Sequence, residues 1–333
     1  MSSIEALPHL TVRACAAGND ALLSLYRDYA QGRTAPATLL TGESGVGKKT
    51  LAHLMAQGLL CAGAGDKPCG QCRECRRYAA RTHPNALFPA PAPREKTIKV
   101  EALRAAIDAL SRHALEAGPR VIVIENAERM TPQAQNCLLK TLEETDADTY
   151  FFLTSDNETA VLPTIRSRCR VIRMQPWPRE RIEELLRRRG IPPERARALS
   201  LYCEGSPGRA LAMQEDESYW AARELVRKTF LSVGRAGDIP RAAALLRDQK
   251  DNGDRLLDIL EQEIRMLLHS AVTGRAADED VPPLFQAAEE KGLTAILESI
   301  LSARRQKAAN VGWAALAEGL MQTISEETST WQL

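Results

Sequence analysis

The chain has 333 residues, a length that suggests two or three domains, and its composition, 44% hydrophobic and 26% charged, is that of a globular protein. Its 44 Lys and Arg residues nearly balance its 43 Asp and Glu residues, which excludes a polybasic nucleic-acid coat or an acidic disordered tail as the main function. No apolar run approaches the roughly 18 residues of a membrane span, and residues 1–20 lack a basic start followed by an apolar core, so a cytoplasmic protein is expected.

Short apolar runs alternate with helical patterns in the first half of the chain. Thr38–Thr41 predicts a buried strand, followed by a glycine-rich turn and a helix from about Lys49 to Leu60. The prolines of residues 83–93 exclude a helix there and leave room for a short edge strand near Leu87. Further on, helices are expected at Glu101–Leu115 and Thr131–Glu144, and strands at Val121–Ile124, Tyr150–Thr154 and Arg170–Met174. This alternation predicts an α/β domain whose mostly parallel sheet is covered on both faces.

The pattern changes at Gln175–Pro178, after which every element is expected to be helical. Three short helices are predicted first, at Arg179–Arg188, Pro193–Tyr202 and Gly208–Gln214, and longer amphipathic helices follow from about Ser218. The predicted organisation is an α/β domain over residues 1–176, a small helical domain over 177–216 and a larger all-α domain over 217–333.

A phosphate-binding loop pattern lies between the first predicted strand and its helix; its residues are Gly42, Gly45, Gly47 and Lys48. The glycines allow backbone N–H groups to converge on phosphate oxygens, and Lys48 supplies a positive charge. The pattern normally ends in Ser or Thr, whose hydroxyl holds Mg²⁺. Here that position is Lys49, and Thr50 lies one residue late, about 100° further around the helix. The sequence predicts a degenerate nucleotide site and leaves open whether ATP or ADP still binds there or the loop is retained as structure.

The second element of such a site is an apolar strand that ends in a metal-holding Asp and a water-activating Glu. Val121–Ile124 supplies the strand, but Glu125 and Asn126 follow it. Glu125 keeps a carboxylate on a longer arm, whereas the amide of Asn126 takes no proton and cannot serve as a general base. Because Lys49 and Asn126 alter two independent parts of the site, this chain is not expected to hydrolyse ATP.

Four of the eight cysteines fall within residues 61–75 and form a metal-binding pattern; they are Cys61, Cys69, Cys72 and Cys75. Four thiolates at this spacing suit a tetrahedral zinc ion without an open coordination position, so the zinc would be structural. The other four cysteines are expected to be ordinary buried thiols; they are Cys15, Cys137, Cys169 and Cys203.

Two arginines are candidates for contacts with phosphate. Arg168 lies just before the last predicted strand, where Arg166, Arg168 and Arg170 alternate, so an extended segment would point all three to one side. An arginine there could stabilise transition-state charge on a neighbour's phosphate, although a solvated surface arginine is the simpler interpretation of this segment alone. Arg209 is expected in the first turn of a helix, where it opposes the helix dipole, which favours a functional reason for it.

Taken together, the loop at Gly42–Lys48, the four-cysteine module and the strand Val121–Ile124 resemble the AAA+ clamp-loader subunits of bacterial replicative DNA polymerase. Three further segments look like signatures of this family: Asn136–Glu144, Ser167–Cys169 and Gly205–Leu211. The resemblance implies an AAA+ α/β domain with an inserted zinc module, a helical lid domain and a helical collar that serves oligomerisation. The last part of the chain resembles the family's collar domain in its length and in its helical pattern.

Within the family, the altered nucleotide motifs are similar to a rigid ring member rather than to the gamma/tau motor, which would carry a hydroxyl residue at position 49, Asp at 125 and Glu at 126. The resemblance implies an accessory subunit of the polymerase holoenzyme, whose partners are the delta and gamma/tau subunits, the sliding clamp and primed DNA. It also implies that Arg168 acts in trans as an arginine finger on a neighbour's ATP, and that Arg209 belongs to the second-sensor signature. Whether the chain is an enzyme in its own right is left open.

Two other functions fit parts of the sequence. One is an active ATPase of gamma/tau type, in which Thr50 or Lys49 replaces the missing hydroxyl and Glu125 or Glu128 does the acid–base work; phosphate release by the isolated chain would distinguish it. The other is a zinc-dependent nucleic-acid binding module built on the cysteines and Arg76–Arg77. Against this module, aromatic residues make up 5% of the chain and do not interleave with basic residues as single-strand binding requires.

Overall fold

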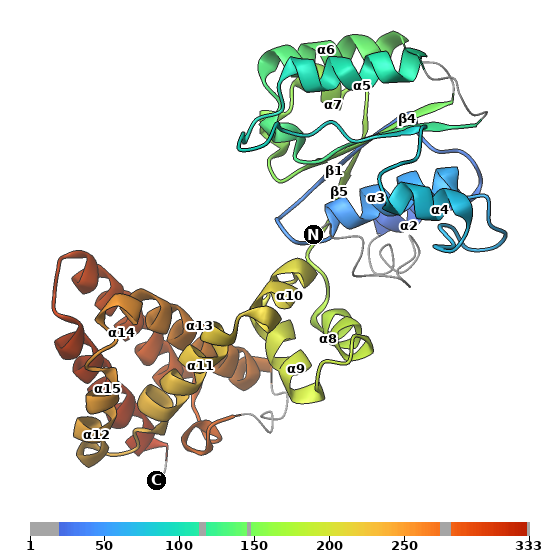
Figure 1. Ribbon diagram of the computed structural model, residues 1–333. Coiled ribbons are helices and arrows are strands. Elements are labelled where there is room, and N and C mark those ends of the chain that lie inside the picture. Colours follow the sequence, from blue (N-terminus) through green and yellow to red (C-terminus); the bar gives the residue numbers. More distant parts are fainter. Residues whose placement is uncertain (1–19, 113–117, 145–147, 274–280, 332–333) are drawn as a thin grey trace. The chain divides into compact units, whose positions relative to one another are not determined.

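The computed structural model describes residues 20–112, 118–144, 148–273 and 281–331 (Figure 1). The chain folds into two compact units, each made of two segments. The first unit comprises Met1–Leu185 and Cys203–Arg209, and the second comprises Leu186–Tyr202 and Ala210–Leu333. The predicted division into three domains, at residues 176 and 216, stays a prediction. Cys15 and the last residues of the helix expected to reach Leu115 lie outside the described residues.

A five-stranded parallel sheet forms the centre of the first unit, in the order β2-β3-β4-β1-β5. Its strands are β1 (Ala37–Thr41), β2 (Ala86–Leu87), β3 (Arg120–Ile124), β4 (Thr149–Ser155) and β5 (Arg170–Arg173). Each strand falls at a predicted apolar run, and the two-residue β2 lies at one edge, as expected of a proline-rich segment. Because all strands are parallel, the carboxyl ends of β1, β3 and β4 meet at the same end of the sheet, and the loops that follow them lie close together.

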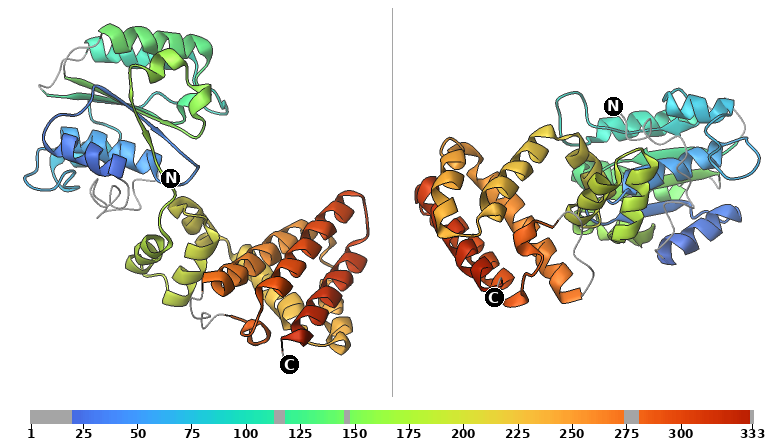
Figure 2. Two further views of the ribbon diagram at one scale, coloured as in Figure 1. Left: turned by 180° about the vertical axis from the view of Figure 1, so that it is seen from behind. Right: turned by 90° about the horizontal axis from the view of Figure 1, so that it is seen from below.

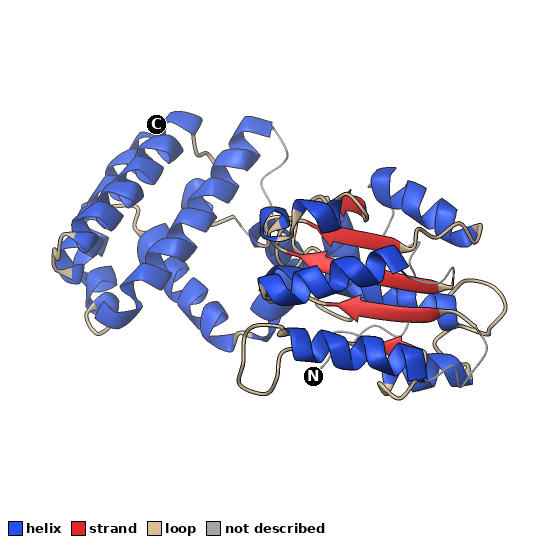
Figure 3. Ribbon diagram, turned by 90° about the horizontal axis from the view of Figure 1, so that it is seen from above, coloured by secondary structure: helices blue, strands red, loops and turns tan. Residues whose placement is uncertain are grey.

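Helices cover both faces of the sheet, as predicted (Figure 1), and Figure 3 looks onto one of these faces, with helices in front of the red strands. Successive strand residues point to opposite faces, so Leu40 and Phe152 enter one core while Leu39 and Phe151 enter the other. On the first face lie α2 (Asp20–Ala30), α3 (Lys48–Leu60) and α4 (Arg73–Ala79), and on the second α5 (Val100–Arg112), α6 (Pro132–Glu144) and α7 (Pro163–Arg166). The predicted N-cap of α6 is confirmed, because Thr131 Oγ1 accepts a hydrogen bond from the Ala134 N–H at 3.3 Å.

All described elements after β5 are helical, as the sequence predicted. The α-helices among them are α8 (Arg179–Arg188), α9 (Pro193–Tyr202), α10 (Pro207–Glu215), α11 (Glu217–Thr229), α12 (Ile239–Leu246), α13 (Gly253–Thr273), α14 (Glu290–Ala308) and α15 (Trp313–Thr330), and short 3-10 helices lie between some of them. Within the second unit, α13 packs against α14 and α14 against α15, and these orange and red helices lie side by side in both views of Figure 2. Among the described helices, none is both apolar enough and long enough to cross a membrane.

One ion pair is buried in the second unit. The Glu263 side chain of α13 is fully buried, and its Oε1 accepts hydrogen bonds from Arg223 Nε and from the Tyr202 hydroxyl, both at 2.6 Å. Burial and the neighbouring Glu263 carboxylate raise the pKa of Tyr202 well above its usual range, so the hydroxyl stays protonated and donates. This contact joins α9, α11 and α13.

Candidate functional site

The predicted phosphate-binding loop connects β1 to α3 at the carboxyl end of the sheet. Gly42 and Gly45 adopt φ angles of +138° and +81°, which side chains rarely allow. A Cβ on Gly42 would also lie 2.5 Å from the Met174 carbonyl oxygen. The glycines that identified the motif are therefore required by the backbone path of the loop.

The carbonyl groups from Gly42 to Val46 all accept hydrogen bonds from within the first unit. Two of them, those of Gly42 and Glu43, accept hydrogen bonds from Lys48 Nζ at 2.7 and 2.5 Å. The next three carbonyls accept hydrogen bonds from more distant segments. The Ser206 hydroxyl donates to Ser44 O at 3.1 Å, and the Gly208 N–H donates to Gly45 O at 2.9 Å. The indole Nε1 of Trp177 donates to Val46 O at 3.0 Å. The turn before α10 thus lies directly against the loop.

Lys48 is buried, with 4% of its side chain exposed, and it is paired with an acid that the sequence analysis missed. Its Nζ lies 2.8 Å from Asp156 Oδ1. Asp156 directly follows β4, which pairs with β1 in the sheet. The rule that loops after adjacent parallel strands meet at one end of the sheet could have identified Asp156, because the apolar run of β4 was predicted.

Glu125 is the centre of a second charged cluster, at the end of β3. Its Oε2 lies 3.0 Å from Lys49 Nζ, and its Oε1 accepts a hydrogen bond at 2.9 Å from His53 Nε2 of α3. Arg81 approaches Oε1 to 3.8 Å. The hydrogen bond from His53, followed by Lys49, outweighs the effect of burial and lowers the pKa of Glu125 to about 2. Glu125 is a carboxylate at neutral pH and a weak base.

His53 is neutral in this arrangement. Its ring is 3% exposed, and burial is the main cause that lowers its pKa, against the opposing effect of Glu125. With Nε2 donating to Glu125, Nδ1 is free to accept a hydrogen bond from the Tyr78 hydroxyl at 2.7 Å. Tyr78 belongs to α4, which begins within the cysteine module. A chain of hydrogen bonds therefore runs from α4 to the end of β3.

The position of a catalytic base is occupied by Asn126, whose φ of 54° and ψ of 57° place it in the left-handed region that asparagine tolerates well. Its N–H donates to Thr154 Oγ1 at 3.1 Å. Glu128 lies in the short helix η1 (Ala127–Arg129), and its Oε2 is buried with no hydrogen-bond partner in the part of the chain that the structure describes. Lys49 and His53 are the α3 residues that contact Glu125. Among the described residues, Thr50 forms no ion pair or hydrogen bond with Glu125.

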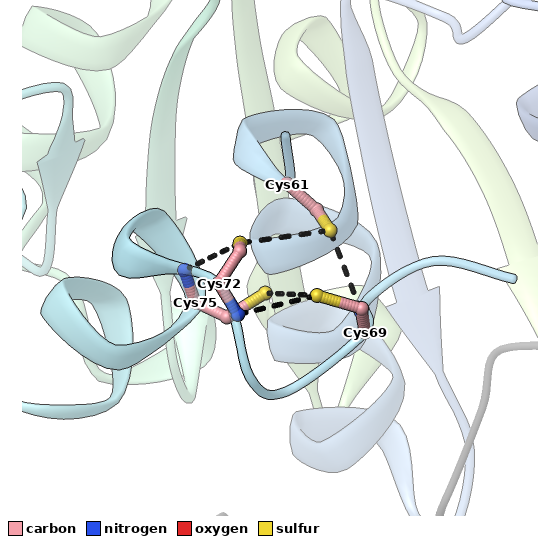
Figure 4. A group of neighbouring side chains, drawn as sticks. All are labelled: Cys61, Cys69, Cys72 and Cys75. Carbon is pink, nitrogen blue, oxygen red and sulfur yellow. Dashed lines mark hydrogen bonds between the residues drawn. The ribbon is translucent and has the colours of Figure 1, made fainter. Parts of the chain in front are cut away.

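The four clustered cysteines come together as predicted (Figure 4). Their Sγ atoms all lie within 4.8 Å of one another, and the Cys61–Cys72 and Cys69–Cys75 sulfur pairs are each 4.0 Å apart. A tetrahedral zinc ion with Zn–S bonds of about 2.3 Å requires sulfurs about 3.8 Å apart, so the group fits this metal. Gly70, with a φ of +72°, makes the turn between Cys69 and Cys72.

Backbone amides donate hydrogen bonds to sulfurs of this site, while burial raises the pKa of Cys61 and Cys75. Cys61 Sγ accepts N–H bonds from Gly63 and Cys69, and Cys72 Sγ accepts one from Cys75, all at 3.4 Å. At Cys72, such bonds outweigh the effect of burial and lower the pKa to about 6. Of the scattered cysteines, Cys203 is buried as expected, whereas Cys137 and Cys169 are partly exposed, which corrects the expectation that they are ordinary buried thiols.

The segment around Arg168 is a helical turn, so the expected extended alternation of arginines was wrong. The N–H groups of Ser167, Arg168 and Cys169 bond to carbonyls three or four residues back, which turns the chain by roughly 100° per residue. The arginines consequently pair with carboxylates of three different elements: Arg166 with Glu158, Arg168 with Glu143 and Arg170 with Asp28. Arg168 Nη2 lies 2.5 Å from Glu143 Oε1, its Nη1 donates to Thr164 O at 3.1 Å, and 41% of its side chain is exposed.

Arg209 lies in the first turn of α10, as predicted, and its unfavourable position on the helix dipole is offset by an ion pair with Glu204. About half of the Arg209 side chain, 52%, is exposed. Its backbone N–H donates to Ser206 Oγ at 3.2 Å, and Ser206 in turn bonds to the loop at Ser44. The structure thus brings the helix turn of Arg209 to the loop, while its guanidinium binds Glu204.

Sequence comparisons with known proteins point to one family. A family model described as "DNA polymerase III, delta subunit" matches residues 18–178. The DNA polymerase III subunit delta-prime of Escherichia coli (strain K12) is 33% identical over 287 residues, which cover 85% of this chain and 82% of the relative. The Bacillus subtilis (strain 168) subunit of the same name is 27% identical over 91% of this chain and 94% of its own length.

A more distant sequence similarity extends to another subunit of the same polymerase. The E. coli subunit tau is 27% identical over 72% of this chain and 38% of tau. Among solved structures, a gamma subunit-related protein from Thermotoga maritima aligns with a TM-score of 0.39 and 18% identity, covering 91% of this chain and 99% of that protein.

Proposed function

The chain belongs to the delta-prime family of DNA polymerase III clamp-loader subunits, and on this premise we propose that it acts as a ring member that does not hydrolyse ATP itself. In this role it assembles with delta and gamma/tau subunits, and the complex places the sliding clamp on primed DNA. The observation that carries the proposal is the ion pair between Lys49 and Glu125, at the position where an ATPase would hold Mg²⁺.

The absence of hydrolysis follows from the groups present at the degenerate site. Lys49 offers an ammonium where the motif requires a hydroxyl, and Mg²⁺ is not bound by a cation. Asn126 cannot accept a proton, and Glu125, with a pKa of about 2, is too weak a base to activate water near neutral pH. These features oppose the alternative of an active gamma/tau-type motor in which Lys49 and Glu125 take over the missing roles.

In this proposal Arg168 is the group that contributes to catalysis, in the ATP site of a neighbouring subunit. A guanidinium with five donors in a planar fork suits a phosphoryl group in the transition state. Arg168 is partly exposed, and its side chain is held at both ends of the guanidinium, by Glu143 and by the Thr164 carbonyl. Such a fixed, accessible arginine is suited to act on a partner's nucleotide.

We also infer that the four-cysteine group binds one structural zinc ion. Four sulfurs at tetrahedral spacing leave no coordination position for substrate, so the metal would stabilise the module rather than react. When bound, zinc would hold Cys61 at the end of α3 next to Cys72 and Cys75 at the start of α4. This keeps Tyr78 in place for its hydrogen bond to His53.

The test is reconstitution with delta and gamma/tau subunits of the same source, followed by assays of ATP turnover and clamp loading on primed DNA. We expect no turnover above background by the isolated chain, and efficient loading by rings that contain it but not by mixtures that lack it. Phosphate release by the isolated chain that disappears in Lys48→Ala would establish the motor alternative. Loading of equal efficiency with and without the chain would reject the proposed role.

A further inference from the structure

One face of α3 leads from the end of β3 to the four-cysteine group. His53, Gln57 and Cys61 follow one another at intervals of four residues, which places them on the same side of the helix. His53 and Gln57 are buried, and Cys61 is the C-cap of α3. The helix therefore presents two buried polar side chains in line with a cysteine of the group.

Both polar side chains bond to α4, the helix that supplies two more cysteines of the group. Gln57 Nε2 donates to the Cys75 carbonyl oxygen at 3.1 Å, and the Tyr78 hydroxyl donates to His53 Nδ1 at 2.7 Å. Cys72 is the N-cap of α4, and Cys75 lies in its first turn. These two bonds anchor α4 to α3 without involving the sulfur of any cysteine.

Aromatic packing holds α4 in the same place. The Tyr78 side chain is fully buried, and its ring meets the Phe88 ring edge-on, with the two centroids 5.3 Å apart. The Phe88 ring also lies 5.7 Å from the His53 ring. Because isolated helices as short as the seven residues of α4 are not stable in water, the position of α4 depends on contacts of this kind.

We propose that Gln57 and Tyr78 are positioning residues of the four-cysteine site: their bonds dock α4 on α3 without a metal, which keeps Cys61, Cys72 and Cys75 close together and sets the affinity for zinc. This inference rests on the proposed zinc site. A site that is already assembled binds more tightly than one that must first dock a helix, because only the assembled fraction of the chain can bind. Hydrogen bonds that support the ligands of a metal typically change its affinity about 10–100-fold.

The experiment compares the full-length wild type with Gln57→Met, Tyr78→Phe and the double variant, in which each change removes a donor and largely conserves the size of the side chain. Gln133→Met in α6 and Tyr150→Phe in β4 are the matched controls. Zinc affinity is measured by competition with a chromophoric chelator. Hydrogen–deuterium exchange of the α4 amides is measured in EDTA and with excess zinc. Thermal unfolding establishes that each variant folds, and Gln57→Leu replaces Gln57→Met if that variant does not.

In EDTA, the α4 amides of the wild type and both controls should be protected, whereas those of the double variant should exchange at least about tenfold faster. The dissociation constant for zinc should rise about tenfold in each single variant and should not change in the controls. Excess zinc should restore the protection of α4 in every variant, because the bound metal then holds the same helix; a general loss of packing would not be restored.

Equal zinc affinity in the wild type and a folded double variant would overturn the inference, and so would α4 amides that exchange freely in the wild type in EDTA. A wild type that binds no zinc would reject the metal site and the inference with it. The titration of the wild type therefore distinguishes failure of the zinc site from failure of the two positioning residues.

Discussion

The guanidinium of Arg168 contacts the carboxylate of Glu143 at 2.5 Å, which joins the turn after α7 to the last turn of α6. Arg168 is 41% exposed and Glu143 45% exposed, so the pair itself contributes little to stability. Its consequence is geometric, because the contact sets where the Arg168 guanidinium lies in this structure. We therefore propose that Glu143 positions Arg168 for the trans-acting role proposed for it.

Replacement of Glu143 by Gln is expected to lower the ATP turnover of reconstituted rings several-fold, because the guanidinium loses its ionic partner while its own charge remains. Glu144→Gln, an exposed neighbour in the same helix turn, is the matched control and should have no effect. In an Arg168→Ala ring the Glu143→Gln change should add nothing, since residues that act as a unit are non-additive. Equal effects of Glu143→Gln in both backgrounds would contradict the positioning role.

The charge of Glu125 should make a measurable contribution to stability that depends on pH. Its pKa is about 2 in the folded chain against an ordinary value of 4.5, so this contribution is complete above pH 4.5 and is lost as the pH falls towards 2. The full shift corresponds to about 3 kcal/mol, but with 35% of the side chain exposed, solvent screening reduces the expected effect to about 1 kcal/mol.

Chemical denaturation of the wild type and Glu125→Gln at pH 7 and at several lower pH values tests this expectation. The variant should be less stable at pH 7, and the difference between the two proteins should close between pH 4.5 and 2. Glu194→Gln, which changes an exposed glutamate, is the control and should follow the wild type throughout. A difference that stays constant across this range would show that Glu125 does not carry the depressed pKa.

Removal of zinc should destabilise the first unit. Structural zinc sites have apparent binding free energies of about 10–16 kcal/mol, so the purified chain should retain one equivalent, and chelation should lower its melting temperature. Cys72→Ser should lose the metal, whereas Cys137→Ser, outside the cluster, should keep it. Elemental analysis and thermal unfolding provide the measurement. Less than about a tenth of an equivalent in protein purified without added metal, with no thermal shift on chelation, would reject the zinc site.

The buried ion pair of the second unit should be sensitive to loss of one partner. Arg223→Ala leaves the Glu263 carboxylate buried without its cation, and the expected loss is about 3–5 kcal/mol in the free energy of unfolding. Arg305→Ala removes an exposed arginine from α14 and should change stability by less than about 0.5 kcal/mol. Denaturant titrations compare the two variants. A cost below about 1 kcal/mol for Arg223→Ala would contradict the expectation that Glu263 depends on Arg223 as its buried partner.

Most of the fold could be predicted from sequence because the buried strands are continuous apolar runs between turn signals. β3 and β4 illustrate this, since a strand covered on both faces has no polar alternation to obscure it. The glycines of the loop and the spacing of the four cysteines were equally informative, because each follows from local geometry that few residue types satisfy.

The contacts that define the site were harder to predict because they join segments distant in sequence. Asp156, His53 and Glu143 are ordinary polar residues with no motif of their own, and their roles depend on which loops and helices meet. The direction of Arg168 was also missed, since alternation predicts a shared face for an extended segment and the chain is helical there. Three-dimensional neighbours, rather than composition or spacing, determine the charges at the loop.

ATP turnover by reconstituted rings that contain Arg168→Ala tests the central claim most directly. We expect these rings to assemble normally and to hydrolyse ATP more slowly than the wild type, by up to about 10³-fold at the site that the arginine serves and by less in the whole ring. Arg168→Lys should rescue poorly, because an ammonium lacks the planar fork. Arg241→Ala, which removes another exposed arginine, should leave turnover unchanged. Unchanged ATP turnover and clamp loading in Arg168→Ala rings of verified stoichiometry would show that Arg168 is a solvated surface residue and would contradict the account.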